Sequence, residues 1–222
     1  MLKSSWKIEY LKGSGEELHA RELPEPVGRL VSILEVNRPA LVLGSTQPET
    51  DVDKDLLERK GIDLVRRRSG GGAVLLVPGE SVWIDVVVPR GDRLWSDDVN
   101  QAFHWLGKVW VDALERLGHG GVAHLGPLVC SQWSRHICFA GVGGGEVRID
   151  NRKVVGISQR RQREGSRFQC LVLKVWSPEV ILELMAMSDE EQNKARTDIE
   201  KIALGIKASS KNIEEAFIDS LP

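Results

Sequence analysis

Short apolar runs in the first half of the chain predict buried strands. Residues 39–44 and 62–65 are two such runs, and the segment 51–60 between them is typical of a helix that Gly61 breaks. We interpret the residues before position 39, which include two early glycines, as a polar lead-in.

Two β-rich runs follow and are joined by a turn signal. Residues 73–77 and 81–88 are rich in Val, Leu and Ile, and Pro78-Gly79 stands between them. Proline presets the φ angle of a turn and glycine tolerates positive φ. We therefore predict a β-hairpin here, which continues the sheet.

The segment 97–117 predicts a helix, because its apolar residues recur at three- and four-residue spacing. Ser96 is the expected N-cap and Gly118 the expected end. Farther on, three β-rich runs joined by polar turns predict a meander. These runs are 146–149, 153–161 and 167–175.

The last part of the chain predicts helices. Residues 178–187 begin a helical tail, and residues 189–221 are polar and helix-prone with a break at Ser209-Ser210. We expect one α/β domain over residues 1–188, with a helical extension over 189–222.

Composition narrows the class of protein. The 222 residues include 30 Lys and Arg against 32 Asp and Glu, so the net charge is −2, which is ordinary for a globular protein. No apolar run approaches the roughly 20 residues that cross a bilayer. Charges at Lys7 and Glu9 interrupt the start where a signal peptide needs an apolar stretch. We expect a cytoplasmic protein with no membrane partner.

The spacing of cysteine and histidine argues against disulfide bonds and metal sites. Cys130, Cys138 and Cys170 form no Cys-x-x-Cys pair, and the five histidines show no metal-binding spacing. We predict neither a disulfide framework nor a metal site.

A triple glycine after three arginines is the most informative local feature. Gly70, Gly71 and Gly72 let the backbone approach a ligand closely and offer N–H groups to an anion, and the arginines suit a phosphate or a carboxylate. A solvated surface turn is the alternative. The run leads into a strand, whereas a P-loop opens a helix.

Cys138 and Lys153 flank the next glycine cluster and a predicted hairpin turn. A free thiol is only a few per cent thiolate at pH 7, so a nearby ammonium would favour nucleophilic chemistry. Spacing alone leaves open that Cys138 is a small buried residue. His136 is either a base for this thiol or a surface histidine, and Cys170 either lines the same site or packs.

Two basic runs, 66–68 and 160–163, suggest nucleic-acid binding as another hypothesis. The net charge of −2 and the lack of aromatics among the basic residues disfavour it, because no stacking surface is indicated. We expect no nucleic-acid partner.

Three ordered segments together resemble the lipoate/biotin protein ligase superfamily, in its lipoate–protein ligase and octanoyltransferase branch. They are Leu43-Gly44-Ser45-Thr46-Gln47, the arginine and glycine run 65–74, and Asn151-Arg152-Lys153 with the strand that follows to Arg161. The resemblance implies a mixed sheet flanked by helices, of the class II synthetase and biotin-ligase type. It also implies a medium-chain acyl substrate such as lipoate or octanoate.

The same resemblance implies that Lys153 points at the acyl carbonyl or thioester and that the glycine loop borders the acyl pocket or an activated phosphate. The residues expected to bind substrate on this basis are Arg67, Ser69, Gly70, Gly71, Gly72, Ala73, Gly156 and Cys170.

The chain resembles the cysteine-dependent branch most. The cysteine-dependent enzymes carry Cys-Phe and then a Glu before the lysine, and this chain has Cys138-Phe139 and Glu146 before Lys153. The Asn-Asp pair that ATP-dependent ligases carry before the lysine is absent here. This implies transfer through a thioester on Cys138 without a cofactor. Acyl carrier protein or free lipoate or octanoate would be the donor, and a lysine of a lipoyl domain or of the glycine-cleavage H protein the acceptor.

Two alternatives stay open. One is a lipoate–protein ligase that uses ATP and Mg to form an acyl-adenylate, in which Cys138 only packs. The other is a non-catalytic relative that binds an acyl group or a lipoyl domain. Departures from the family pattern at 75–77 and at Gln169-Cys170-Leu171, where the family usually has His-Gly, prompt the second.

Overall fold

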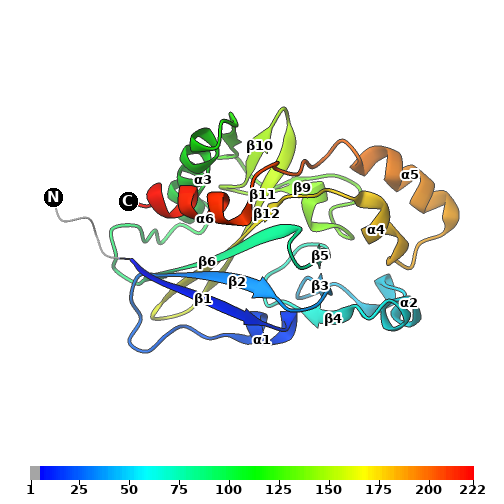
Figure 1. The fold of residues 1–222 in the computed structure, drawn as a ribbon, viewed down its shortest axis with the longest axis horizontal. Helices are drawn as coiled ribbons and strands as arrows, with labels where there is room; N and C mark the ends of the chain where they lie inside the picture. The colour runs from blue at the N-terminus through cyan, green and yellow to red at the C-terminus, as the bar shows by residue number, and fades with distance from the viewer. Residues whose placement is uncertain (1–5) are drawn as a thin grey trace.

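The computed structural model describes residues 6–222, and a mixed sheet forms its centre (Figure 1). The strands of this sheet are β1 Lys7–Gly13, β2 Leu30–Val36, β6 Ser81–Pro89, β7 Val122–Ala123, β10 Val147–Ile149, β11 Arg152–Arg161 and β12 Gly165–Leu173. Their order across the sheet is β1-β2-β6-β12-β11-β10-β7. β1 and β2 are parallel, and all other neighbours are antiparallel.

Two further groups of strands and the helices complete the fold. The strands are β3 Ala40–Leu43, β4 Asp63–Arg66 and β5 Val74–Leu76 in a small sheet, and β8 Val129–Cys130 with β9 Gly141–Val142. The α-helices are α1 Gly15–Ala20, α2 Lys54–Arg59, α3 His104–Arg116, α4 Pro178–Glu183, α5 Asp189–Ile199 and α6 Ser210–Asp219. Short 3₁₀ turns are η1 Glu49–Asp51, η2 Gln101–Phe103 and η3 Cys138–Ala140.

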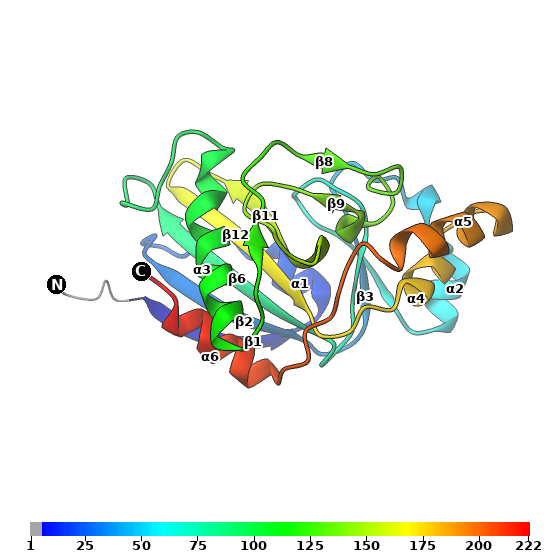
Figure 2. The same cartoon turned by 90° about the horizontal axis from the view of Figure 1, so that it is seen from above.

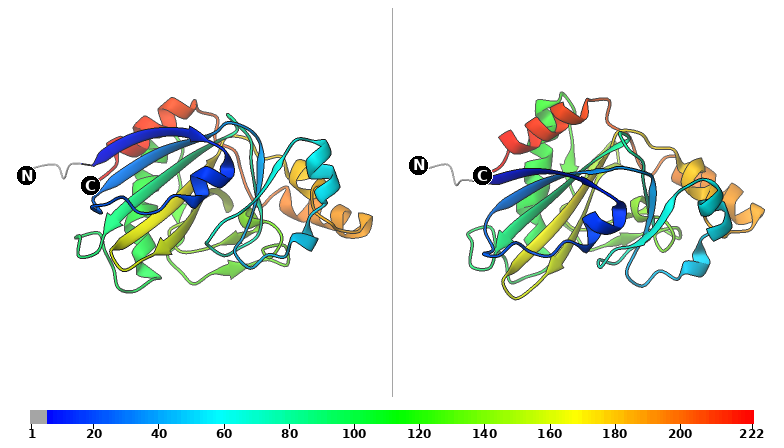
Figure 3. Two further views of the ribbon diagram at one scale, coloured as in Figure 1. Left: turned by 90° about the horizontal axis from the view of Figure 1, so that it is seen from below. Right: turned by 60° about the horizontal axis from the view of Figure 1, so that its bottom comes forward.

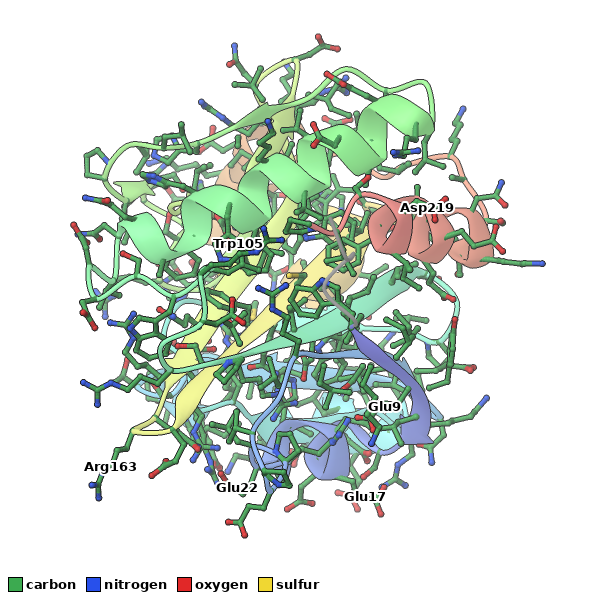
Figure 4. All side chains as sticks on the ribbon, turned by 90° about the vertical axis from the view of Figure 1, so that its left-hand side faces the viewer. Glu9, Glu17, Glu22, Trp105, Arg163 and Asp219 are labelled. Carbon is green, nitrogen blue, oxygen red and sulfur yellow. The ribbon has the colours of Figure 1, made fainter. Side chains whose placement is uncertain are left out.

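Helices α3 and α6 cover one face of the central sheet (Figure 2). Successive side chains of a strand point to opposite faces, so alternate residues of the central strands pack beneath these helices. Trp110 of α3 and Phe217 of α6 are fully buried, with ring centroids 4.4 Å apart. Trp105 extends the contact to Phe168 of β12, and Figure 4 shows it between α3 and the sheet.

The small sheet lies at the end of the molecule where α2, α4 and α5 gather (Figure 1). Leu41, Leu57, Leu182 and Ile199 belong to one buried cluster there. Helix α1 lies on the opposite side of the central sheet from α3 and α6 (Figure 3). The mixed α/β fold with flanking helices agrees with the expectation.

The predicted hairpin over residues 73–88 is wrong. β5 pairs with β3 in the small sheet, whereas β6 pairs with β2 and β12 in the central sheet. The turn at Pro78-Gly79 exists, with Gly79 at φ +80°. It carries the chain from one sheet to the other, because a turn signal specifies a chain reversal and not the pairing of its arms.

The interpretation of the early residues as a polar lead-in is also wrong, since they contain β1, α1 and β2. β1 is an edge strand whose outer positions are exposed, such as Tyr10, so its pattern shows little hydrophobic alternation. Helix α1 is a single short stretch that begins with a capping box between Ser14 and Glu17.

The other predicted elements agree with the structure. Residues 39–44 and 62–65 correspond to β3 and β4, and the meander corresponds to β10, β11 and β12. The expected N-cap of the central helix is wrong. Helix α3 begins only at His104, after η2, and its N-cap is Phe103, which makes no side-chain cap hydrogen bond.

The predicted helical extension contains α5 and α6, separated by the non-helical residues 200–209, and the two helices pack into the two larger core clusters through Ala195, Ile199 and Phe217. A domain boundary at residue 188 stays a prediction. Within residues 6–222, no helix combines the length and the apolar character needed to cross a membrane.

Candidate active site

A cavity of about 790 Å³ lies between the central sheet, β5 and the segment 128–146. This volume is within the range of small-molecule sites. It brings together most of the residues that the sequence singles out, although they come from distant segments. Its lining includes Arg67, Gly70, Gly71, Gly72, Cys138, Lys153, Gly156 and Cys170.

Lys153 is buried beside this cavity and its ammonium is fully paired. Nζ lies 2.7 Å from Glu146 Oε2 and donates to the backbone oxygens of Gly141 at 2.9 Å and Cys138 at 3.2 Å. These acceptors match the three N–H groups of an ammonium. The Phe139 ring also faces Nζ, with its centroid 4.9 Å away.

Glu146 is held as firmly as Lys153. Its Oε1 accepts from the Ile157 amide at 2.9 Å, and its Oε2 accepts from the Gly143 amide at 2.7 Å. A buried carboxylate is stable only when it is paired and hydrogen-bonded. The pair with Lys153 therefore forms a fixed polar floor next to Cys138.

Backbone hydrogen bonds tie the Cys138 segment to the glycine loop. The Ala73 amide donates to His136 O and the Cys138 amide donates to Ala73 O, both at 2.8 Å. Ala73 and Ile137 form a parallel β-bridge. Ala73 thus acts through its backbone and is fully buried.

The glycine loop is shaped by close backbone packing. A Cβ on Gly72 would lie 2.4 Å from Ile137 N, and a Cβ on Gly44 would lie 1.8 Å from Gly71 O. Gly71 has φ +98°, which favours glycine. The buried Arg67 guanidinium donates to the oxygens of Gly70 and Gly72 at 2.8 Å, so the arginine holds the loop from inside.

An apolar wall starts at Cys138. Its half-buried side chain packs against the buried cluster of Phe139, Leu173 and Ala203, and Val74 and Leu171 pack against the same cluster. Val74 and Leu171 in turn pack with Leu76 and Trp83 in a neighbouring cluster. Cys138 thus contacts the polar floor through its backbone oxygen, which accepts from Lys153, and packs its side chain against a surface suited to a hydrocarbon chain.

The three cysteines lie in different environments. Cys138 is half-buried, Cys130 is exposed, and Cys170 is fully buried. Burial raises the pKa of the Cys170 thiol well above its usual range, so this thiol stays protonated. Of the three, Cys170 is thus the least suited to be a nucleophile, and its side chain belongs to the core under α3.

The catalytic-domain model of the lipoyl protein ligase A/B family matches residues 15–216. The chain belongs to this family. Membership confirms the expected enzyme class, in which an acyl group of the lipoyl type is transferred to protein.

Two relatives of this chain bear the name octanoyltransferase LipM. Octanoyltransferase LipM from Kyrpidia tusciae is 27% identical over 195 residues, which cover 82% of this chain and 70% of the relative. LipM from an Exiguobacterium species is 26% identical over 184 residues, and the match covers 78% of this chain and 64% of the relative.

Two solved structures that resemble this chain are lipoate–protein ligases. The bi-partite lipoate protein ligase from Thermoplasma acidophilum gives a TM-score of 0.75 at 16% identity, over 96% of this chain and 81% of that one. A lipoate-protein ligase A bound with ATP gives 0.71 at 16% identity, over 96% and 83%. These similarities show that the family fold is shared.

Three residues that the sequence singled out do not line the cavity. Ser69 and Ala73 do not line the cavity, and Ser69 instead hydrogen-bonds to Ser158 at 3.1 Å. His136 is also outside the lining, and its Nδ1 lies 3.7 Å from Asp51 Oδ2. The backbone turns into η3 at Cys138, so the extended geometry that would place both side chains on one face is absent.

Sequence reasoning gave no role to Gln47 or His19, which both line the cavity, and it named Glu146 only through the resemblance to the cysteine-dependent branch. Gln47 appears only within a family segment, and His19 lies in the misread lead-in. The spacing of Glu146 from Lys153 is a usable signal, since a lysine that is buried needs a carboxylate. No sequence pattern brings His19 to this cavity.

Over residues 6–222, no group of three or more His, Cys, Asp and Glu side chains is arranged to hold a metal ion.

Proposed function

We propose that this chain is an acyltransferase of lipoyl assembly that carries an octanoyl or lipoyl group on Cys138. The observation that carries the proposal is the place of Cys138, between the buried Lys153–Glu146 pair and the apolar wall. The hydrocarbon part of an acyl group fits the wall, while its carbonyl stays at the polar floor.

The first step is thioester exchange. The Cys138 sulfur attacks the carbonyl carbon of a donor thioester, a new C–S bond forms, and the donor thiol leaves with the proton that Cys138 gives up. In the second step the neutral amine of an acceptor lysine attacks the acyl-cysteine. A C–N bond forms, the C–S bond to Cys138 breaks, and the amine proton returns to sulfur.

Lys153 assists both steps as a hydrogen-bond donor. Its bond to Cys138 O, at 3.2 Å, is the longest of its three. When charge develops on the acyl oxygen, the ammonium exchanges this acceptor for the oxyanion. The backbone of Gly70, Gly71 and Gly72 borders the same cavity and supplies further N–H donors.

We infer the partners by analogy. The LipM relatives are named octanoyltransferases, and the Thermoplasma ligase is described with its E2 lipoyl domain. We therefore propose a lysine of a lipoyl domain, or of the glycine-cleavage H protein, as acceptor. Acyl carrier protein that carries the acyl group as a thioester is the proposed donor, and this exchange on Cys138 needs no cofactor. Free lipoate or octanoate has no leaving thiol, so it is the donor only in the ligase alternative, which uses ATP and Mg.

Intact-protein mass spectrometry tests the proposal. Wild-type protein is incubated with octanoyl-acyl carrier protein without ATP, beside Cys138→Ala and the matched control Cys130→Ala. We expect an octanoyl adduct in the wild type and in Cys130→Ala that hydroxylamine removes, and no adduct in Cys138→Ala. An adduct that persists in Cys138→Ala refutes the proposal.

A parallel reaction with lipoate or octanoate, ATP and Mg tests the ligase alternative. Pyrophosphate release that is equal in wild type and Cys138→Ala would assign an adenylating ligase and leave Cys138 as a packing residue. Binding of acyl groups with neither adduct nor pyrophosphate would identify a non-catalytic relative.

A further inference from the structure

His19 brings an unused hydrogen-bond donor to the cavity. Its ring packs on Trp83 with centroids 4.4 Å apart and 35° between the ring planes, and Gln169 Nε2 lies 3.3 Å from its Nδ1. An amide nitrogen can only donate, so Nδ1 accepts and the proton of the neutral ring resides on Nε2. This Nε2 is buried and has no hydrogen-bond partner among residues 6–222.

The ring is neutral, and it is half-buried with its Nε2 atom buried. Burial, together with the nearby charges of Arg167 and Arg67, lowers the pKa of His19 to about 3. Near neutral pH the group is therefore an uncharged N–H donor, which has no reason to attract a carboxylate. Its natural partner is a neutral acceptor atom on a bound molecule.

The surrounding residues hold His19 in this position. Arg167 donates to the oxygen of Leu18 in α1 at 2.7 Å and to that of Arg21, the C-cap of α1, at 2.6 Å, and it forms a buried ion pair with Asp85. Asp85 also accepts from Trp83 Nε1 at 2.8 Å. One carboxylate thus anchors both the helix end that carries His19 and the ring on which His19 packs. This is a built site and not an incidental contact.

His19 lies at the far end of the apolar wall from Cys138. Leu173 of β12 packs in the cluster that contains Cys138, Leu171 follows along the wall, and Gln169 is the residue that contacts His19. Four residues of a strand span about 13 Å. A chain attached at Cys138 and laid along Leu171 therefore directs its distal end toward Trp83 and His19.

We propose that His19 Nε2–H selects acyl chains that carry sulfur at their distal end, so that the cavity prefers a lipoyl group to an octanoyl group. This inference rests on the proposed acyl-binding role of the cavity. Disulfide sulfur is a weak acceptor, but a methyl end offers none and leaves the buried donor unpaired. A site built around a buried donor discriminates against the analogue that lacks the acceptor.

Calorimetric titration of the full chain with lipoic acid and with octanoic acid tests the inference. We expect the wild type to bind lipoic acid about fivefold more tightly than octanoic acid, and His19→Phe to bring this ratio to about one. Phenylalanine keeps the packing on Trp83 and removes the donor. His119→Phe, outside the cavity lining, is the matched control and should keep the wild-type ratio. A wild-type ratio of one or less, or a His19→Phe ratio equal to that of the wild type, overturns the proposal.

A second measurement does not depend on a folded variant. In the wild type labelled with ¹⁵N-histidine, lipoic acid should shift the Nε2 resonance of His19 and octanoic acid should shift it much less. Equal shifts for both acids contradict the proposal. Free acids bind without ATP and without turnover, so these readouts stay informative if Cys138 proves not to carry an acyl group.

Discussion

The two faces of the central sheet differ in what they bury. Beneath α3 and α6, residues such as Phe168 and Val172 of β12 pack against Trp110 and Phe217 in an apolar layer. On the cavity side, the alternate residues Gln169 and Leu171 of the same strand line a cavity that also contains buried charges. The described buried charged side chains all border the cavity or support His19, and they are Arg67, Asp85, Glu146, Lys153 and Arg167.

The difference teaches how one strand serves two tasks. Alternation lets β12 contribute to stability through one set of residues and to the site through the other. Apolar packing under the helices supplies the free energy that offsets burial of charge on the opposite face. Substitutions on the two faces should therefore have separable effects.

The largest effect is expected at Lys153. Lys153→Met leaves the buried Glu146 carboxylate without its cation, so unfolding free energy should fall by about 3–5 kcal/mol and acyl transfer by about 100-fold or more. Urea denaturation and transfer assays measure both. The double variant Lys153→Met/Glu146→Gln should regain much of the stability but none of the activity. A double variant as unstable as Lys153→Met would contradict this assignment of the cost.

On the opposite face, Phe217→Ala should lower the unfolding free energy by about 3–5 kcal/mol, because it removes a fully buried ring that stacks on Trp110. Activity per folded molecule should stay unchanged. Denaturation curves and active-site titration measure the two quantities, and Phe217→Leu, expected to cost less than about 1.5 kcal/mol, is the control. Loss of specific activity in a folded Phe217→Ala protein would show that the faces are coupled.

The third prediction concerns pH and His19. Its pKa of about 3 is below the ordinary value of 6.5, so the unfolded chain binds the proton more readily between these values. Stability from the neutral ring is present above pH 6.5 and is lost as pH falls toward 3. The unfolding free energy of the wild type should therefore fall more steeply than that of His19→Phe, by about 1.4 kcal/mol per pH unit below pH 6. Parallel curves for the two proteins would exclude this burial effect.

The smallest expected effect is a difference in stability between alanine substitutions at two glycines of the cavity loop, Gly70 and Gly72. Gly72→Ala should lower the unfolding free energy by about 1–3 kcal/mol, since its Cβ would meet the backbone at Ile137. Gly70→Ala meets nothing within 4 Å and should change stability by less than about 0.5 kcal/mol. Thermal unfolding of both variants measures the contrast. Equal destabilisation would mean that the loop, and not the close approach, sets the cost.

Elements with strong local signals were predictable from the sequence. The meander from β10 to β12 and the helix α3 follow from periodicity, and the family segments predicted the glycine loop and Lys153 at one site. A local sequence pattern does not show which strands pair with each other. The turn at Pro78-Gly79 was predicted, but β5 and β6 join different sheets because their partners lie far away in sequence.

The site was less predictable where it depends on an edge of the fold. β1 exposes one side to solvent and α1 is short, so neither has a strong period. His19 was missed for this reason. The role expected of Cys170 depended on its exposure, and burial of a thiol in the core beneath α3 is a tertiary property that its neighbours in sequence do not reveal.

Main-chain packing around Gly44, Gly71 and Gly72 has an evolutionary consequence. The segments that carry the glycine loop and Cys138 touch backbone to backbone, with no side chain between them. A side-chain substitution therefore cannot change the distance between these segments without disrupting their contact. Positions such as Val74, Leu76 and Leu171 remain free to change in size and polarity. A lineage can alter which chains it accepts while it inherits the geometry of the reacting groups intact.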